Sequence, residues 1–445
     1  MMSNHSSESL PGQTALEHKT LEHMTLEGTR LRQRSPRQII ELQEYVSQRF
    51  PGEVLSHELG EKLWRDYGKQ VAVEFPSVKT DGEYQLTAHG YAGYIPLSPH
   101  LHLWLHPKVP VGNLFRMWEY AYGLKMEFLP ELYDCGTIGE FYESLAIVLA
   151  RRVRQRAQQG LYRSYIPKTD LLPHVRGRLD RRAFTPSPND PRLLCHYRSQ
   201  TADLEENRIL AWTLFSIARC PLISKRSLPL VRQAYRALME EVTLQPCSAA
   251  DCVRRRYNRL NEDYAVLHAL CRFFLEASGP SHHAGDHSML PFLVDMERLF
   301  ELFVAQWLRS HLPRHIRLHE QQRVPLNAQG NLSFKIDLVL SDRRSGQVLA
   351  VLDTKYKRSS QPGADDVAQV AAYAQTQGCR EAALVYPVWE AAAQDKNSSK
   401  AILKKSVDRG PALEVWVGNI RVRNLAFRLD GDLENNGQEL MKSLF

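Results

Sequence analysis

Three charged residues interrupt or follow apolar segments in the last third of this sequence. Asp353 and Lys355 come after the apolar run at 348–352, and Asp337 interrupts a second apolar run at 336–340. Successive side chains of a β-strand point to opposite faces, so a strand there would direct Asp353 and Lys355 to the same side. Burying such charges costs several kcal/mol unless they are paired or bind a ligand, which indicates a function for them.

These residue types are suited to metal-dependent hydrolysis of phosphodiesters. Hairpin pairing of the two strands would bring Asp337 opposite Asp353, and two converging carboxylates completed by water molecules suit Mg²⁺. The Lys355 ammonium could orient or deprotonate an attacking water, or neutralise charge on the phosphate. The sequence therefore predicts a magnesium-dependent nuclease site. The alternative is an ordinary ion pair at a sheet edge, which would stabilise the fold little.

Five predicted elements position these residues, in the order helix, strand, strand, helix, strand. The patterns predict an amphipathic helix at 292–308, strands at 333–340 and 348–356, a helix that contains 367–374, and an apolar strand at 381–387.

The second helix of this region carries two further candidates, Gln369 and Tyr373. They are four residues apart and therefore lie on the same helical face, from which they could support the site or contact the DNA backbone. Packing of Tyr373 against the sheet is the alternative.

The rest of the chain predicts a multidomain α+β protein. Short alternating runs favour a β-rich N-terminal domain, which we expect to begin with a helix at 37–49. Apolar residues three and four apart favour a helical middle region, with a strand-like interruption at 160–200. A linker-like segment around 278–287 precedes the last domain, which we expect to be an α/β restriction-endonuclease-like fold. The predicted parts are a disordered tail at 1–30, the β-rich domain at 31–112, the helical region at 113–280 and the nuclease domain at 281–445.

Composition adds limits on partners and location. The formal net charge is +7, and arginines cluster near 151–156 and 176–182, which is compatible with a polyanion partner or with solvated helix and turn surfaces. There is no run of about 18 apolar residues and no secretory leader pattern. The seven cysteines are scattered, so we expect a cytoplasmic protein without a membrane span. The histidines at 282, 283 and 287 fit a flexible loop better than a metal site.

The charged trio resembles the PD-(D/E)xK nuclease superfamily. Asp337 and Asp353 match its two acidic positions and Lys355 its lysine, although Ile336 stands where the superfamily has proline. In that superfamily a glutamate on the first core helix often joins the metal site. Glu301 is our candidate for this third ligand, and Glu297 and Asp295 are the competing choices. The spacing of Gln369 and Tyr373 is similar to that in restriction-type and RecB-type nucleases.

A longer resemblance, over about 85–430, is to the McrC family, the nuclease subunit of McrBC-type modification-dependent restriction systems. Short segments in a fixed order carry it: His106-Pro-Lys-Val, Leu114-Phe-Arg-Met-Trp-Glu-Tyr-Ala, Val175-Arg-Gly-Arg-Leu-Asp, Asn207-Arg-Ile-Leu and Asp295-Met-Glu-Arg-Leu-Phe-Glu-Leu-Phe-Val.

The resemblance implies a DNA endonuclease that acts with a separate, hexameric McrB-like AAA+ GTPase and stimulates it, docking through the N-terminal part. The partner would bind GTP and recognise methylated cytosine in double-stranded DNA. In agreement, the chain contains no Gly-x-x-x-x-Gly-Lys-Ser/Thr phosphate-binding loop. Arg176 and Arg178 would be candidates for phosphate contacts, with a structural turn around Gly177 as the alternative. A non-catalytic adaptor of an AAA+ partner and a stand-alone repair nuclease remain open.

Overall fold

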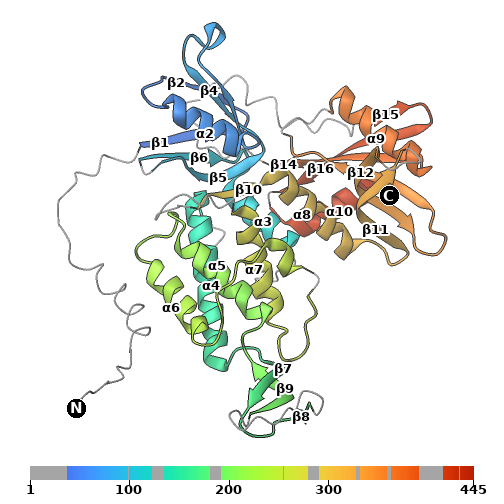
Figure 1. Cartoon of the computed structure of the whole chain (residues 1–445). Coiled ribbons are helices and arrows are strands. Elements are labelled where there is room, and N and C mark those ends of the chain that lie inside the picture. Colours follow the sequence, from blue (N-terminus) through green and yellow to red (C-terminus); the bar gives the residue numbers. More distant parts are fainter. Residues whose placement is uncertain are drawn as a thin grey trace, which may run out of the picture.

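The computed structural model describes most of a mixed α/β chain with several parts (Figure 1). Described are residues 38–98, 100–122, 135–180, 192–253, 255–278, 290–326, 331–357, 362–389, 414–429 and 431–444. The tail predicted at 1–30 and the histidines at 282, 283 and 287 lie outside these residues. Within the described ranges, no helix is both long enough and apolar enough to cross a membrane.

The N-terminal part contains two small sheets and a helix that share one apolar core. Leu42, Leu63, Leu86 and Leu103 are fully buried in this core. One sheet has the strand order β1-β6-β5-β10 and the other β2-β4-β3. The elements are β1 (Gln38–Gln43), β2 (Ser47–Phe50), α2 (His57–Tyr67), β3 (Val71–Glu74), β4 (Tyr84–Ala88), β5 (Tyr91–Pro96), β6 (Leu101–His106) and β10 (Phe292–Asp295).

The helix predicted at 37–49 is wrong, because this segment forms β1 and β2. Ile40 and Leu42 are buried while the residues between and beside them are exposed, which is the two-residue period of a strand. β1 then pairs in parallel with β6, a partner about sixty residues away that the local pattern could not indicate.

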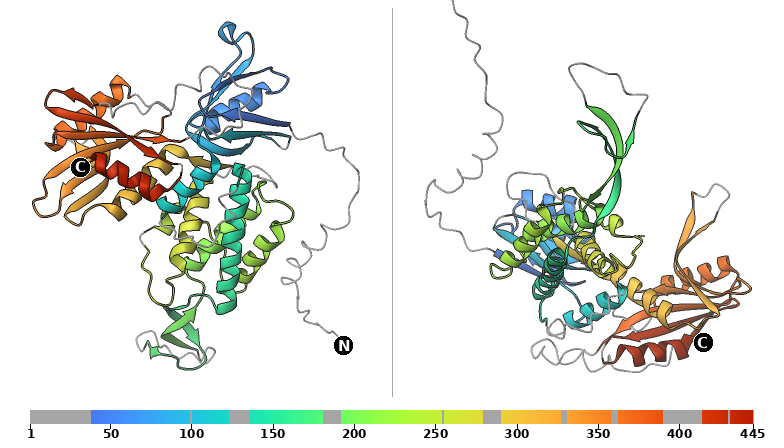
Figure 2. Two further views of the ribbon diagram at one scale, coloured as in Figure 1. Left: turned by 180° about the vertical axis from the view of Figure 1, so that it is seen from behind. Right: turned by 90° about the horizontal axis from the view of Figure 1, so that it is seen from below.

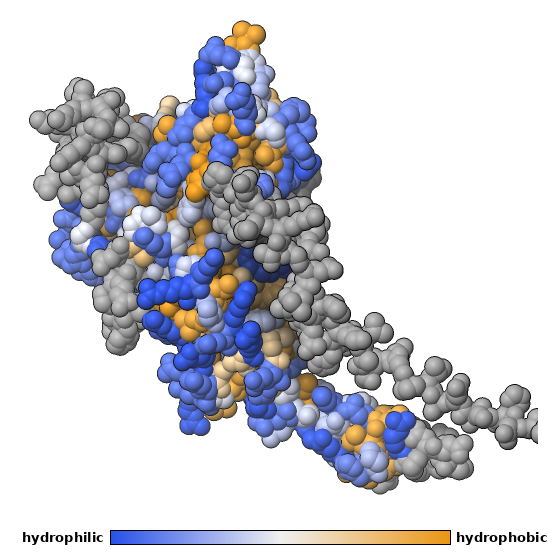
Figure 3. Space-filling model, turned by 90° about the vertical axis from the view of Figure 1, so that its left-hand side faces the viewer, coloured by the Kyte–Doolittle hydropathy of each residue, from blue (hydrophilic) through white to orange (hydrophobic). Residues whose placement is uncertain are grey.

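The middle part is helical and ends in a three-stranded arm that projects from it (Figures 1 and 2). Figure 3 shows apolar side chains near the far end of this arm, where Leu171 and Val175 are about half exposed. The elements are α3 (Val111–Ala121), α4 (Ile138–Gln159), α5 (Glu205–Ala218), α6 (Leu228–Met239) and α7 (Tyr264–Ala277), with β7 (Ser164–Leu172), β8 (Arg178–Leu179) and β9 (Leu193–Thr201) in the arm.

The C-terminal part is a six-stranded mixed sheet with helices on both faces. α8 and α10 pack on one face, where Leu338, Leu352 and Phe427 are buried. α9 packs on the other face, where Val339 and Val351 are buried. The strand order is β11-β12-β13-β14-β16-β15. The elements are α8 (Met296–His311), β11 (Ile316–Pro325), β12 (Ser333–Asp342), β13 (Val348–Thr354), α9 (Ala364–Gln377), β14 (Glu381–Val388), β15 (Glu414–Val417), β16 (Ile420–Arg428) and α10 (Leu433–Leu444).

The helix predicted at 292–308 starts later than expected. Residues 292–295 form β10, which pairs antiparallel with β5 and so completes the N-terminal sheet. The helix begins at Met296, where the Asp295 side chain accepts a hydrogen bond from the Arg298 backbone N–H at 2.9 Å and caps the first turn. β10 therefore connects the N-terminal sheet directly to the first helix of the C-terminal part.

Candidate active site

The two predicted aspartates lie where β12 and β13 separate. Antiparallel pairing reaches Leu338 opposite Leu352, and Asp337 and Asp353 are the next residues outward on the two strands. The Asp337 carboxylate accepts hydrogen bonds from the Thr354 backbone N–H and hydroxyl, both at 3.0 Å. These two hydrogen bonds from Thr354 hold the Asp337 carboxylate beside the end of β13.

Asp353 is a buried acid with an ammonium partner. It is 4% exposed, and its Oδ2 lies 2.8 Å from Lys355 Nζ. Burial is the main cause that raises the pKa of Asp353 to about 6, and the negative charge of Asp337 raises it further, while Lys355 opposes the shift. Asp337 lies opposite Asp353 on the neighbouring strand, so a cation bound between them would relieve the repulsion of Asp353 by Asp337.

Lys355 is held by a chain of polar contacts that leads to α9. Its Nζ donates to Gln369 Oε1 at 2.9 Å, and Gln369 Nε2 donates to the Tyr373 hydroxyl at 2.7 Å. Tyr373 also packs edge-on against Phe334 of β12, with ring centroids 5.0 Å apart. The structure therefore brings Gln369 and Tyr373 to the trio, and Tyr373 both packs on the sheet and contacts Gln369.

Among the three acids at the start of α8, Glu301 is the one that faces this site. Burial raises the pKa of Glu301 to about 7, and the charge of Asp337 adds to the shift. Its carboxylate accepts a hydrogen bond from Gln321 Nε2. In contrast, Glu297 accepts from the Tyr45 hydroxyl at 3.2 Å and Asp295 accepts from the Tyr91 hydroxyl at 3.3 Å, so both face the N-terminal sheet.

Sequence reasoning missed Asp366, a nearly buried acid in the first turn of α9. Its carboxylate oxygens each lie 2.9 Å from Lys357 Nζ, and Oδ1 lies 3.8 Å from Lys355 Nζ. These lysines lower the pKa of Asp366 despite the opposing effect of burial. A helix-starting acid is usually only a cap, so its type and position gave no signal of contact with Lys355.

Gln321 on β11 was also missed. The register of β11 with β12 runs through Glu320 opposite Leu338 and resumes at Gln322 opposite Ile336, which leaves Gln321 across from Asp337. Gln321 has φ +50°, a left-handed conformation that is strained for a residue with a side chain. This local distortion accompanies the contact of its amide with Glu301.

The donor set fits a hard, water-rich cation such as Mg²⁺. Asp353 Oδ2 is buried and accepts no well-directed hydrogen bond from the described residues, although the Lys355 ammonium is close. Within the described part of the chain, no three His, Cys, Asp or Glu side chains form a preformed metal cluster. Two carboxylates, with Glu301 nearby, suit Mg²⁺ because this ion keeps several waters and commonly uses one or two protein carboxylates.

The predicted DNA contacts Arg176 and Arg178 lie in the arm and are not part of this site (Figure 1). The Arg176 guanidinium stacks on the Tyr197 ring, 4.2 Å from its centroid. Gly177 between the two arginines has φ +71°, and a Cβ there would lie 2.5 Å from the His196 carbonyl oxygen. The structure thus supports the structural role of this turn, and phosphate contacts by the two arginines remain a prediction.

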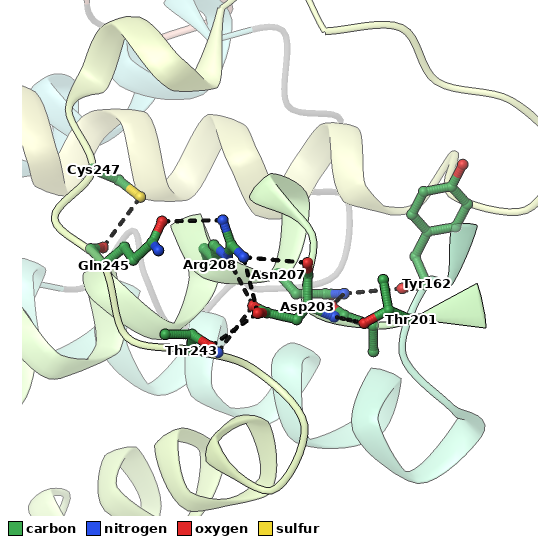
Figure 4. A network of polar contacts seen from close by, with 9 residues as sticks. Tyr162, Thr201, Asp203, Asn207, Arg208, Thr243, Gln245 and Cys247 are labelled. Atoms are coloured by element: carbon green, nitrogen blue, oxygen red, sulfur yellow. Dashed lines mark hydrogen bonds and ion pairs between the residues drawn. The ribbon is translucent and has the colours of Figure 1, made fainter. Parts of the chain in front are cut away.

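The Asn207-Arg-Ile-Leu segment has a structural role at the base of the arm (Figure 4). Asn207 Nδ2 donates to the carbonyls of Tyr162 at 2.9 Å and Ala202 at 2.7 Å. These two residues lie just before β7 and just after β9, where the chain enters and leaves the arm. Arg208 forms a two-pronged ion pair with Asp203, at 2.7 and 2.9 Å. The segment joins α5 to the arm.

Comparisons with known proteins agree with this architecture. The chain is 22% identical over 271 residues to the type IV methyl-directed restriction enzyme EcoKMcrBC of Escherichia coli (strain K12), a match that covers 57% of this chain and 75% of that protein. It also resembles a chain of the refined half-complex from the tetradecameric assembly of Thermococcus gammatolerans McrB AAA+ hexamers with bound McrC. That fold similarity has a TM-score of 0.56 at 19% identity and covers 92% of this chain and 100% of the other.

The family assignment depends on a third comparison, which spans well over half of the chain. The model of the family described as "McrBC 5-methylcytosine restriction system component" matches residues 86–387, from the N-terminal sheet to the end of β14. The chain therefore belongs to the family of McrBC 5-methylcytosine restriction system components.

Proposed function

We propose that this chain is the DNA-cutting subunit of its restriction system, a Mg²⁺-dependent endonuclease of the PD-(D/E)xK type. The observation that carries the proposal is the buried Asp353, paired with Lys355 and repelled by Asp337 at the point where β12 and β13 separate. A structural ion pair would not need a second carboxylate whose charge opposes the first.

The chain's own residues would divide the work at the phosphodiester. Asp337 and Asp353, with Glu301 as a third acid, would hold the cation, which when bound would neutralise charge on the phosphate and lower the pKa of a bound water. Asp353 and the other nearby acids raise the pKa of Lys355, although burial opposes them. Lys355 therefore stays charged near neutral pH, which suits a role in orienting water or stabilising phosphate charge better than a role as a base.

Gln369 and Tyr373 would keep the lysine in place. Because the Gln369 carbonyl accepts from Lys355 Nζ and its amide donates to Tyr373, the lysine has one preferred direction toward Asp353. Such supporting contacts matter because positioning errors of about 1 Å can reduce rates about 100-fold.

We further propose that cutting requires a separate McrB-like AAA+ GTPase. The similar Thermococcus assembly contains McrB AAA+ hexamers with bound McrC, and the chain has no phosphate-binding loop of its own. The partner would deliver methylated double-stranded DNA, and the N-terminal part of this chain would dock on the partner.

The test is cleavage of methylated plasmid DNA by the full chain assembled with its AAA+ partner, GTP and Mg²⁺. Asp353→Asn keeps the side-chain shape but removes the charge, and it should reduce cutting at least about 1000-fold, as loss of a central catalytic group does. Stimulation of GTP hydrolysis in the partner should be unchanged.

Asp342→Asn is the matched control, because Asp342 is an acid at the C-terminal end of the same strand, where its carboxylate accepts hydrogen bonds from the Ser345 backbone N–H and hydroxyl. Cutting by this variant should stay within about twofold of wild type, as expected for a surface change. Full cutting by Asp353→Asn would refute the nuclease assignment and favour the adaptor.

A further inference from the structure

A lysine from the N-terminal part contacts the backbone directly after the candidate catalytic lysine. Lys108, of the His106-Pro-Lys-Val segment, donates from Nζ to the Tyr356 carbonyl oxygen at 2.7 Å. The same ammonium lies 3.9 Å from the centroid of the Tyr356 ring. Tyr356 follows Lys355 in the chain. Lys108 therefore contacts the backbone just beyond β13, the strand that carries Asp353, although about 250 residues separate Lys108 from Tyr356.

Tyr356 is enclosed by residues of the N-terminal part and α8, which we call the Tyr356 socket: Glu44, Tyr45, Lys108, Val109 and Phe300. Tyr356 is 3% exposed, and its hydroxyl lies 3.5 Å from Glu44 Oε2. The Val109 backbone lies beside this hydroxyl and opposes the rise of its pKa that burial causes, and the Phe300 ring centroid is 6.3 Å from that of Tyr356. The side chain is thus fixed from several directions.

The charges of the socket depend on one another. Glu44 is 3% exposed, and its Oε2 accepts the Lys108 backbone N–H at 3.1 Å. Burial raises the pKa of Glu44, and the positive charge of Lys108 opposes this shift. Lys108 also lies 4.7 Å from the Tyr45 ring centroid, which adds a second cation–π contact. A cation with a nearly buried acid and two aromatic rings is a specific arrangement rather than a solvated surface charge.

The backbone after β13 is held on both sides of Lys355. The Lys355 N–H donates to the Val385 carbonyl of β14 at 2.9 Å, and the Tyr356 carbonyl accepts from Lys108. These two contacts hold the backbone of Lys355, and so the direction of its Cα–Cβ bond, while Gln369 and Asp353 hold the ammonium at the other end of the side chain.

We propose that Lys108 is a positioning residue for the nuclease site: by fixing the Tyr356 carbonyl, it sets the place of the Lys355 ammonium relative to Asp353. The inference rests on the nuclease function proposed above and gives the N-terminal part a role in cutting besides docking. A movement of the N-terminal sheet would shift the end of β13 through this contact.

The experiment compares Lys108→Met with Lys62→Met in the full chain assembled with its AAA+ partner. Methionine keeps the apolar stem and removes the ammonium. Lys62 is the matched control because its Nζ donates to the Leu97 carbonyl at 2.9 Å, within the N-terminal part and away from the catalytic strand. Single-turnover cutting, the DNA concentration for half-maximal rate, and stimulated GTP hydrolysis are measured for both.

Lys108→Met should reduce the cutting rate at saturating DNA at least about tenfold, as loss of a supporting contact does. The half-saturating DNA concentration and the stimulated GTP hydrolysis should stay within about twofold of wild type, since docking and DNA binding do not use this contact. Lys108→Arg, which keeps a cation over the two rings and a donor for the Tyr356 carbonyl, should recover most of the rate.

Equal cutting by Lys108→Met and Lys62→Met would overturn the positioning role, and so would equal loss of cutting and of GTP hydrolysis. If Lys108→Met does not fold, Lys108→Gln, which removes the charge and is one bond too short to place a nitrogen where Lys108 Nζ lies, must show the same selective loss. Failure of the underlying nuclease function gives a different result, because Asp353→Asn would then cut DNA normally.

Discussion

Folding makes two acids of the candidate active site, Asp353 and Glu301, harder to ionise. The pKa of Asp353 rises from 3.8 to about 6, first because of burial and then because of Asp337. The folded state therefore binds this proton more tightly than the unfolded state does. The resulting stabilisation is present below the unfolded pKa and is lost as the pH rises through about 6.

Asp353→Asn should consequently change the pH dependence of stability in metal-free protein. Wild type should lose about 1–2 kcal/mol relative to the variant between pH about 5 and pH about 7.5, because only wild type must ionise the buried acid. Denaturant unfolding of both proteins at a series of pH values measures this difference. A stability difference that does not vary with pH would contradict the buried, repelled state of Asp353.

Gln369 should affect the cutting rate because it holds the Lys355 ammonium. Gln369→Ala removes the acceptor of the lysine ammonium and should slow cutting about 10–100-fold, as loss of a supporting contact at a metal site does. Gln375→Ala is the control, since Gln375 is exposed on the same helix. Equal cutting rates of the two variants would show that Lys355 needs no such support.

At the level of elements, the arm depends on its attachment to α5. Asn207 is fully buried, donates to the two arm ends and accepts from the Tyr264 hydroxyl at 2.6 Å. Asn207→Ala removes these three buried hydrogen bonds and should lower the free energy of unfolding by about 2–4 kcal/mol. Denaturant unfolding measures this change, with Gln233→Ala on the exposed face of α6 as a control that should have little effect. An equally small change for Asn207→Ala would show that Asn207 does not hold the arm to α5.

The elements also show what the sequence could and could not predict. β13 and α9 were predictable because their local patterns, an apolar run and a small-residue helix, match their burial. β10 was not, since three apolar residues and Asp295 in front of an amphipathic helix extend the helical pattern, and their partner β5 lies about 200 residues upstream. β11 was missed because its sequence is largely polar, as befits a strand at the sheet edge.

The candidate site also has residues that the sequence could predict and contacts that it could not. Asp337, Asp353 and Lys355 could be predicted because a charge within an apolar strand is conspicuous in the sequence. The contacts of Asp366 and Gln321, and the choice of Glu301 over Glu297, depend on how α8, α9 and β11 pack around the strands. The Lys108 contact is more distant still, because it joins two parts of the chain that local patterns treat separately.

On the scale of the whole molecule, β10 connects the N-terminal sheet to α8 and thereby to the candidate site. Gly93 on β5 has φ +149°, and a Cβ there would lie 1.9 Å from the Phe292 carbonyl oxygen of β10. β10 can pair with β5 only because this residue has no side chain.

Gly93→Ala should separate β10 from β5 and lower the free energy of unfolding by about 3 kcal/mol or more. Gly82→Ala is a fitting control, because Gly82 also has a positive φ, +78°, but no atom lies within 4 Å of its added Cβ. That variant should lose about 1–2 kcal/mol from backbone strain alone. Similar losses in the two variants would mean that the close approach of β5 and β10 contributes little.

Asp337 and Asp353 are the residues that we propose hold the metal ion for DNA cutting. The most direct measurement is the cutting rate of the assembled complex as a function of Mg²⁺ concentration, for wild type and for Asp337→Asn. We expect Asp337→Asn either to abolish cutting or to raise the half-saturating Mg²⁺ concentration at least about tenfold, because a carboxylate ligand is lost. An unchanged Mg²⁺ dependence with full cutting would contradict this role.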